Sequence, residues 1–308
     1  MKIGIDLGGT KIEAIVIQDN GKELNRVRMD TPVGNYYDTI IAIRDLVKDL
    51  TVEHKIQLDV PVGIGIPGSL SPATGLVKNS NSTCLTGMPL DEDLSRVLQR
   101  PVRIANDADC FAVSEAYDGA GKGANSVFGV ILGTGVGGGI VINGKLWPGR
   151  NRIAGEWGHL PLPWSTPSAD NNASKHETKH KERKCYCGKS RCIETYLSGP
   201  ALEADFKVIT GTNLKAADIA KKCDLYDPAA VYVMARYEHR LARALASVIN
   251  VLDPDVIVLG GGLSNIHRLY DTVPLIWQDW VFSDHCATRL VQNIHGDSSG
   301  VRGAAWLW

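Results

Sequence analysis

Three cysteines of this 308-residue chain lie close enough in the sequence to share a metal ion. Cys185, Cys187 and Cys192 fall within the segment CYCGKSRC, whereas the other four of the seven cysteines are widely separated. Closely spaced thiolates are typical zinc ligands, so the spacing favours a metal over a crosslink. The alternative is that all three are reduced cysteines without a ligand role, because an odd total fits a reducing compartment.

Three glycine turns each follow an apolar, strand-like run. They lie at Gly8-Gly9-Thr10-Lys11, Gly133-Thr134-Gly135 and Gly260-Gly261-Gly262. Glycine lets backbone N–H groups approach a phosphate without a Cβ in the way. One such turn alone could be explained by the geometry of a hairpin or a β-bulge, whereas three together indicate a bound nucleotide. None fits the P-loop or the Rossmann pattern.

An acidic residue at the end of a predicted strand could act as a base. Asn106 and Asp107 end the run VRIAND, and a helix pattern follows. A carboxylate at this position can orient a hydroxyl and accept its proton in phosphoryl transfer. Both residue types also cap helices, and the two roles can coexist.

The elements that must position these residues alternate between strand and helix patterns, which predicts an α/β fold. The first half of the chain predicts two β-rich runs within 2–17 with a hairpin turn at 19–21, a helix from 36 to about 55, a strand from 62, a strand ending at about 106 and a helix over 107–117. The second half predicts a strand–turn–strand unit within 126–144, a helix from 228 to about 252, a strand after 253 and a short helix within 298–308. Asp227 and Pro228 are the predicted cap and first-turn residue of the long helix.

Length and composition restrict the class of protein. A chain of 308 residues is longer than one core usually grows, so two lobes with a cleft are expected. A net charge of -1 predicts neither a nucleic-acid nor a membrane partner, and no apolar run is long enough to span a bilayer. With no room for a signal peptide before Lys2, we expect a cytoplasmic protein. The polar segment Ser165–Lys184 predicts an exposed loop, whose His176 and His180 we expect to be irrelevant as ligands.

Taken together, these motifs resemble the ROK family of sugar kinases and sugar-responsive repressors. In chain order they are DLGGTK at 6–11, Asn106-Asp107-Ala108, GTGVGGG at 133–139, GEWGH at 155–159, CYCG at 185–188, Cys192-Ile193-Glu194 and GGG at 260–262. The resemblance implies an α/β, two-lobed actin-like (RNase H-like, ASKHA) sugar kinase fold with nucleotide and sugar in the interlobe cleft. It implies a small lobe of residues 1–118 plus about 296–308, a large lobe of residues 119–295 with a zinc-binding loop and a dimerisation surface, and a homodimer.

The resemblance also implies roles for single residues. Asp107 is the implied catalytic base, and Asp6 lies near the Mg²⁺ that accompanies ATP. The implied ATP-binding residues are Gly4, Ile5, Asp6, Leu7, Gly8, Gly9, Thr10, Lys11, Gly133, Thr134, Gly135, Val136, Gly137, Gly138, Gly139, Ile140, Gly261 and Gly262. The implied sugar-binding residues are Gly68, Asn79, Asn106, Asp107, Glu156, His159 and Glu194, and the implied structural zinc ligands are His159, Cys185, Cys187 and Cys192.

Three alternatives stay open within this assignment. Lys11 could be a solvated lysine at a strand end. Glu156 and Glu194 could orient the zinc ligands instead of contacting sugar. Arg191 stands where the family pattern prefers glycine, which implies strain if that position needs a positive φ.

The expected activity is phosphorylation of a free hexose by ATP at the 6-hydroxyl. The segments GIPGSLSPATGLVKNSNST, PLPW and HGDSSGVRGAAWLW resemble the fructokinases of this family, so fructose is the first expected acceptor and mannose the second. N-acetylglucosamine kinase and glucokinase are the alternatives. A sugar-sensing repressor is disfavoured, because the phosphate loop begins at Asp6 and leaves no room for an N-terminal helix-turn-helix.

Overall fold

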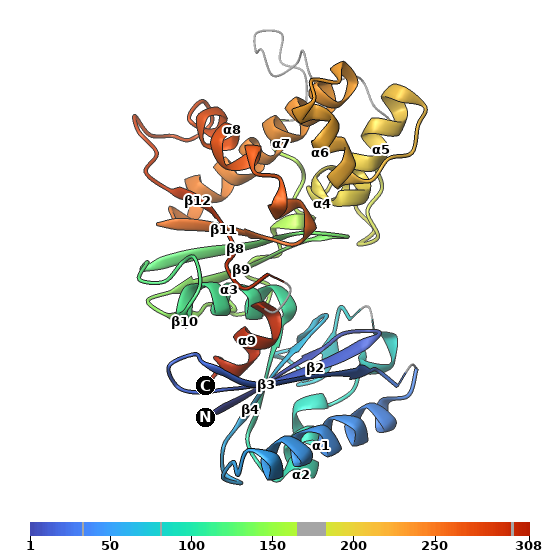
Figure 1. Ribbon diagram of the computed structural model, residues 1–308, viewed down its shortest axis with the longest axis vertical. Helices are drawn as coiled ribbons and strands as arrows, with labels where there is room; N and C mark the ends of the chain where they lie inside the picture. Colours follow the sequence, from blue (N-terminus) through green and yellow to red (C-terminus); the bar gives the residue numbers. More distant parts are fainter. Residues whose placement is uncertain (33, 81, 165–182, 297–298) are drawn as a thin grey trace. The chain divides into compact units, whose positions relative to one another are not determined.

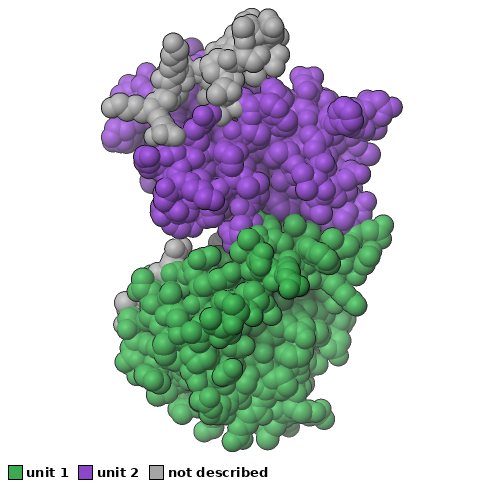
Figure 2. Space-filling view, turned by 180° about the vertical axis from the view of Figure 1, so that it is seen from behind, with its two compact units in different colours: residues 1–125, 139–155, 294–308 green, residues 126–138, 156–293 purple. Residues whose placement is uncertain are grey.

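The computed structural model describes residues 1–308 except 33, 81, 165–182 and 297–298. Most of the loop predicted at Ser165–Lys184, including His176 and His180, therefore lies outside the described residues. The chain divides into two compact units, coloured separately in Figure 2. Unit 1 comprises residues 1–125, 139–155 and 294–308, and unit 2 comprises residues 126–138 and 156–293.

Unit 1 is built on a five-stranded sheet of order β3-β2-β1-β4-β7. Its strands are β1 (Lys2–Leu7), β2 (Lys11–Ile17), β3 (Glu23–Asp30), β4 (Val62–Ile66) and β7 (Val102–Asn106). The first three form an antiparallel meander, and β4 and β7 run parallel to β1. The predicted hairpin turn lies between β2 and β3, where Gly21 has a φ of +84°.

Helices cover both faces of this sheet. They are α1 (Tyr36–Glu53), α2 (Leu90–Leu98), α3 (Asp107–Tyr117) and α9 (Ser299–Ala305). Apolar side chains of β1, β2 and β4 form a buried core with those of α1 and α2. A small antiparallel hairpin, β5 (Ser69–Leu70) and β6 (Val77–Lys78), and the 3₁₀ turn η1 (Thr83–Leu85) complete the connection from β4 to α2.

The predicted C-terminal helix docks on the N-terminal strands. Figure 1 shows α9, in red, between α3 and the blue strands of unit 1. The approach depends on glycine, because a Cβ on Gly63 would lie 1.7 Å from the carbonyl oxygen of Ala304, and one on Gly303 would lie 1.6 Å from that of Cys110. Trp308 then donates from Nε1 to the carbonyl oxygen of Val62 at 3.1 Å. Residues from both chain ends therefore share one core.

Unit 2 contains most of a second sheet, of order β10-β9-β8-β11-β12. Its strands are β8 (Ser126–Leu132), β9 (Val136–Ile142), β10 (Lys145–Leu146), β11 (Val256–Gly260) and β12 (Arg289–Gln292). Strand β11 is parallel to β8 and to β12. Most of β9 and all of β10 belong to unit 1, where Gly139 packs closely on α3, since a Cβ there would lie 2.6 Å from the carbonyl oxygen of Ala108.

The helices of unit 2 surround one long central helix. They are η2 (Trp157–His159), α4 (Glu194–Leu197), α5 (Gly199–Thr210), α6 (Ala216–Asp224), α7 (Pro228–Leu252), η4 (Gly262–Asn265) and α8 (Arg268–Trp277). Helix α7 packs against α4, α5, α6 and α8. As predicted, Asp227 caps it, and its side chain accepts from the backbone N–H of Ala230 at 2.9 Å. No helix among the described residues is long and apolar enough to cross a bilayer.

Candidate functional site

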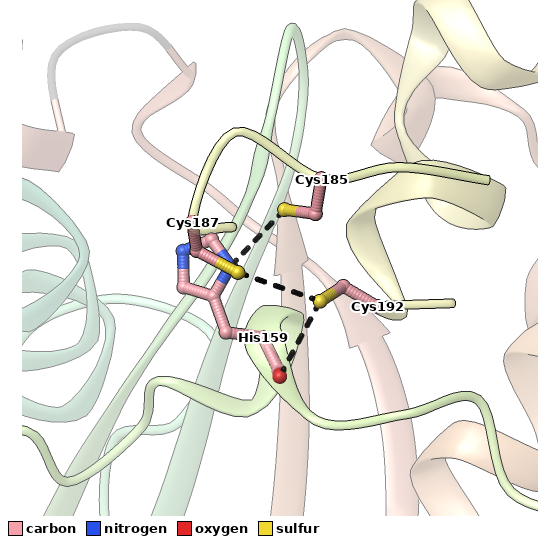
Figure 3. A group of neighbouring side chains, drawn as sticks. All are labelled: His159, Cys185, Cys187 and Cys192. Carbon is pink, nitrogen blue, oxygen red and sulfur yellow. Dashed lines mark hydrogen bonds between the residues drawn. The ribbon is translucent and has the colours of Figure 1, made fainter. Parts of the chain in front are cut away.

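One histidine and three cysteines converge in unit 2 as a set of four ligand atoms. Figure 3 shows His159, Cys185, Cys187 and Cys192 pointing toward a common centre, with their ligand atoms within 4.8 Å of one another. The Cys185 Sγ lies 3.6 Å from His159 Nδ1, and the Cys187 and Cys192 sulfurs are 3.6 Å apart. Tetrahedral zinc bonds of 2.0–2.3 Å place ligand atoms about 3.3–3.8 Å apart. The set therefore fits a closed zinc site.

Tyr186, which the sequence analysis did not single out, holds the histidine ring from the other side. Its hydroxyl lies 3.1 Å from His159 Nε2, and the two rings meet edge to face with centroids 5.2 Å apart. A partner on the second ring nitrogen fixes which nitrogen can face a metal. The aromatic residue between two cysteine ligands is the sequence signal for this contact.

Burial makes two of the three thiols, Cys185 and Cys192, poor anions unless a cation is bound. Removal from water raises the pKa of Cys192 to about 12, and burial also raises the pKa of Cys185. Zinc binds thiolates, so metal binding would displace protons from the buried sulfurs. The donor set and the burial of Cys185 and Cys192 both suit a structural metal.

The loop that carries the cysteines contains a strained residue. Arg191 has a φ of +64°, the left-handed region that favours glycine. Hydrogen bonds hold the backbone there, since Arg191 N–H donates to the Arg183 carbonyl at 2.8 Å and its carbonyl accepts from Leu162 at 2.9 Å. The position does require a positive φ, so Arg191 carries the backbone strain that the sequence analysis gave as a possibility.

Glu194 connects the cysteine loop to the second glycine turn. This residue begins α4, and its Oε2 accepts from the backbone N–H of Val136 at 3.1 Å. A Cβ on Gly135 would lie 2.6 Å from the same oxygen, so a larger residue there would displace the carboxylate. The other oxygen lies 3.8 Å from Cys185 Sγ. One carboxylate thus touches both the turn and the cysteine cluster.

The residues around Glu156 fix η2 on β9. Glu156 itself is exposed directly before η2. Trp157 donates from Nε1 to the Gly137 carbonyl at 2.9 Å, and a Cβ on Gly158 would lie 2.2 Å from the Val136 carbonyl oxygen. His159 is thereby placed at the end of η2 by contacts with the second glycine turn's strand.

The second and third glycine turns lie side by side. Gly261 has a φ of +77°, and a Cβ there would lie 2.5 Å from the Leu132 carbonyl oxygen, directly before Gly133. The Gly133 carbonyl accepts from Gly199 N–H, the first residue of α5, at 2.8 Å. The structure therefore brings these two turns together within unit 2, whereas Gly137 and Gly139 are engaged in packing β9 on its neighbours.

In unit 1 the candidate base stands in the first turn of α3. Asn106 caps the helix by accepting from the Ala108 N–H at 2.8 Å, and its Nδ2 donates to the Gly68 carbonyl at 3.3 Å. Asp107 is exposed. Asn79 follows β6 with a φ of +56°, and the hairpin of β5 and β6 begins next to Gly68. These four predicted sugar residues are thus grouped around one helix start, and capping is one role of Asn106.

The first glycine turn closes a tight hairpin. Gly8 N–H donates to the Lys11 carbonyl at 2.9 Å, and the Thr31 hydroxyl donates to the Gly8 carbonyl at 2.8 Å. Gly9, Thr10 and Lys11 are exposed, beside a cavity of about 200 Å³ lined by Gly8 and Gly9.

Two predicted nucleotide residues do not lie on this exposed side. Ile5 is fully buried, and a Cβ on Gly4 would lie 2.3 Å from the Val301 carbonyl oxygen in α9. Both residues are packed in the interior of unit 1, so neither of them is open to a ligand. They support the strand from which the turn projects.

Asp6 is the most perturbed acid near this turn. Burial, followed by the negative charges of Asp107 and Glu13, raises its pKa to about 6. A carboxyl that is costly to ionise in the free protein is suited to a bound cation, because the cation favours the charged form. Its carboxylate is also close to α9, since a Cβ on Gly300 would lie 3.3 Å from Asp6 Oδ2.

A buried charge cluster behind the cysteine loop was missed by the sequence analysis. Asp205 on α5 pairs with Arg240 at 2.5 Å, with Arg236 at 3.2 Å and with Arg183. Arg183 also donates to the Thr195 carbonyl at 2.6 Å, next to Glu194. Arginines at 236, 240 and 243 share one face of α7, and this spacing on a largely apolar helix was the available signal.

Comparison with known proteins identifies the family. The model of the ROK family matches residues 2–308. The N-acetyl-D-glucosamine kinase of Yersinia pseudotuberculosis serotype O:1b is 39% identical over 307 residues, which cover 100% of this chain and 98% of that protein. The solved structure of the ROK hexokinase from Thermus thermophilus has a TM-score of 0.84 and 28% identity, covering 100% of this chain and 97% of that one. The ROK glucokinase from Streptomyces griseus, solved with glucose and AMPPNP, has a TM-score of 0.73 and 28% identity. The match covers 99% of this chain and 97% of that one.

These findings confirm the family resemblance and the two-lobed actin-like α/β fold. They do not support the preference for fructose, because relatives that are 37–39% identical are named N-acetyl-D-glucosamine kinases. The predicted alternative is the better match to those names. The chain therefore belongs to the ROK family and is an ATP-dependent sugar kinase.

Proposed function

We propose that this chain transfers the γ-phosphoryl group of ATP to the 6-hydroxyl of a free hexose, with N-acetyl-D-glucosamine as the first candidate acceptor. The names of the relatives, 37–39% identical over nearly their whole length, support that acceptor. Fructose is the second candidate, supported by the resemblance of GIPGSLSPATGLVKNSNST and HGDSSGVRGAAWLW to fructokinases. The observation that carries the reaction type is the exposed Asp107 carboxylate at the start of a capped helix.

Asp107 is the proposed base. Its carboxylate orients the acceptor hydroxyl and takes its proton as the phosphoryl group is transferred. Asn106 and Gly68 form a hydrogen-bonded support for the sugar next to this base. Asn79, at the end of the β5–β6 hairpin, is the fourth proposed contact from unit 1.

The glycine turns and Asp6 are the proposed ATP and Mg²⁺ residues. Bound Mg²⁺ neutralises phosphate charge during transfer. Gly8, Gly9 and Thr10 offer an exposed turn to the phosphates, and Asp6 supplies a carboxylate whose raised pKa favours pairing with a cation. In unit 2 the adjoining turns at Gly133 and Gly261 are the proposed partners of the rest of the nucleotide.

The unit 2 carboxylates and the cysteine cluster form the proposed sugar and zinc site. Structural zinc on His159, Cys185, Cys187 and Cys192 would fix both the loop before Glu194 and the η2 turn after Glu156. Glu156, His159 and Glu194 are the proposed sugar contacts, since carboxylates accept hydrogen bonds from sugar hydroxyls. Glu194 already orients the second glycine turn through Val136, so contact and positioning are compatible roles.

An ADP-release assay with a sugar panel tests the proposal. The panel consists of N-acetyl-D-glucosamine, fructose, mannose, glucose and N-acetylmannosamine, with product position determined by NMR. We expect N-acetyl-D-glucosamine to give the highest kcat/KM. If fructose gives the highest kcat/KM, the proposed acceptor is wrong but the proposed reaction stands. If no sugar gives ADP release, the proposed reaction itself is wrong.

The matched variants Asp107→Asn and Asn106→Asp separate base from cap. Asp107→Asn removes the proton acceptor, so kcat should fall by about 10²–10⁴-fold with little change in ATP affinity. Asn106→Asp keeps a good cap but loses the Nδ2 donor to Gly68, so its defect should appear mainly in sugar KM. Near-normal turnover of Asp107→Asn contradicts the assignment.

The homodimer implied by the family resemblance remains part of the proposal. Sedimentation equilibrium of the full chain with and without zinc tests it, and a monomer at micromolar concentration would exclude a stable dimer.

A further inference from the structure

A cavity of about 450 Å³ lies wholly within unit 1, on the edge-strand side of the sheet. Its walls come from β5, from β7, from α3, from the segment around β10 and from the last three residues of the chain. Volumes of this size hold small metabolites. Apart from Asn106, none of its lining residues has a role in the proposed reaction.

The charged side chains around the cavity are mostly basic. Arg103, Lys145 and Arg152 line it, with Asp109 as the one acidic residue among the described lining residues. Arg103 is held in place by stacking 3.9 Å over the Trp308 ring and by donating to the Leu307 carbonyl. Within the described parts of the chain, the side chains of Lys145 and Arg152 form neither an ion pair nor a hydrogen bond. Two exposed cations without a described protein partner therefore stand at one cavity.

A buried donor without a partner lies in the same wall. Trp306 is 7% exposed, and among the described residues its Nε1 has no hydrogen-bond acceptor. Its ring is fixed by stacking on Tyr117 with centroids 4.8 Å apart. The nitrogen itself has almost no accessible surface, so it is closed to a ligand in the cavity, and Trp306 contributes a rigid aromatic wall.

We propose that this cavity binds the phosphate monoester of a small metabolite. The ester oxygens accept from Lys145 and Arg152, and the remainder of the metabolite packs on Leu146 and the aromatic wall. Basic side chains recognise phosphate oxygens through charge-assisted hydrogen bonds. A hexose 6-phosphate and a nucleoside monophosphate share this chemistry.

Binding there has a consequence for catalysis that rests on the proposed function. Asn106 lines the cavity and also caps α3 directly before Asp107. An ester in the cavity therefore adjoins the residue that caps the helix carrying the base. Because coupling between two binding sites is reciprocal, a change in ester Kd on addition of the sugar would measure it.

Calorimetric titration of the full chain without ATP tests the proposal. The probes are N-acetylglucosamine 6-phosphate, fructose 6-phosphate, AMP and inorganic phosphate, each with saturating N-acetyl-D-glucosamine or fructose present to keep product out of the sugar site. The variant is Lys145→Gln/Arg152→Gln. The control is Lys48→Gln/Lys122→Gln, which changes charge equally at exposed positions of unit 1 outside the cavity.

We expect at least one ester to bind with millimolar or tighter Kd and to bind about tenfold or more weakly to the cavity variant, with the control unchanged. Equal binding to both double variants, or no saturable binding of any probe, overturns the site. Turnover of the cavity variant without added ester should equal that of the control variant. Loss of ester binding therefore tests this site, and loss of turnover tests the proposed kinase activity, in separate measurements.

Discussion

Asp6 of unit 1 and Asp205 of unit 2 are shielded carboxylates near the proposed sites, and their surroundings are opposite. In unit 2, Asp205 is 4% exposed and pairs with three arginines, whose charges hold its pKa below its usual range although burial alone would raise it. In unit 1, burial and two neighbouring acids raise the pKa of Asp6 to about 6. Asp205 is neutralised by the protein, whereas Asp6 is not.

This difference separates a structural acid from one suited to a ligand. A buried charge that is fully paired stabilises its surroundings mainly by keeping its partners satisfied. A carboxylate placed among other acids destabilises the free protein and gains most from a cation. Unit 2 should therefore depend on its internal ions and on zinc, and unit 1 on Mg²⁺ with ATP.

Removal of zinc should have the largest effect and should be confined to unit 2. Without the metal, the cysteine loop that supports Glu194 loses its brace, and we expect a loss of roughly 5 kcal/mol or more in the free energy of unfolding. Calorimetry with metal analysis measures this, and hydrogen exchange locates it. Protection should fall around Val136 and Glu194 but not around Gly8. An unchanged melting temperature after verified metal removal would contradict a structural zinc.

Asp205→Asn should cost about 3–5 kcal/mol, because it leaves the guanidinium groups of Arg183, Arg236 and Arg240 without a carboxylate. The lowered pKa means that the ionised form stabilises the native state above about pH 4 and that this contribution is lost as pH falls further. Urea unfolding at pH 7 measures the difference. The exposed Asp224→Asn is the control, and equal stability of the two variants would show that the cluster contributes little.

Asp6→Asn should change stability in the opposite direction. A raised pKa means that the native state binds the proton more tightly, so stability is fully present near pH 4 and falls as pH rises through about 6. A shift of about two pKa units corresponds to about 3 kcal/mol, so the variant should be more stable by up to that amount at pH 7.5 without Mg²⁺. Urea unfolding at both pH values measures it, with pH 4 as the internal control. A variant that is less stable at pH 7.5 would contradict the comparison.

Local patterns in the sequence were sufficient to predict the elements that carry the site. The apolar spacing of 36–55 and the Asp227-Pro228 start predicted α1 and α7, and the glycine turns predicted the hairpins at Gly8 and Gly133. Each of these features depends on residues a few positions apart, so their physical causes are visible in a short segment.

Contacts between distant segments could not be predicted in this way. The Asp205 cluster joins α5, α7 and the cysteine loop, and the contact of Glu194 with Val136 joins residues 58 positions apart. Arginines in a helix usually lie in solvent, so their burial depends on an acid that only the fold brings near. The acceptor sugar depends on pocket shape in the same way, and motifs shared across the family do not determine it.

Arg191→Gly should have the smallest effect and should sharpen the description of unit 2. The arginine is held at a φ of +64° by its backbone bonds to Arg183 and Leu162, and Arg183 is the arginine that ties the cysteine loop to Asp205. Glycine relieves a conformational cost of about 1 kcal/mol at such an angle, and its greater freedom in the unfolded chain offsets part of the gain. We therefore expect a rise of about 0.5 kcal/mol in the free energy of unfolding and slower release of zinc to a chelator. The exposed Lys189→Gly in the same loop is the matched control for flexibility, because its φ is not positive. If Arg191→Gly weakens the site as much as Lys189→Gly does, the side chain of Arg191 contributes more through its contacts than its backbone angle costs.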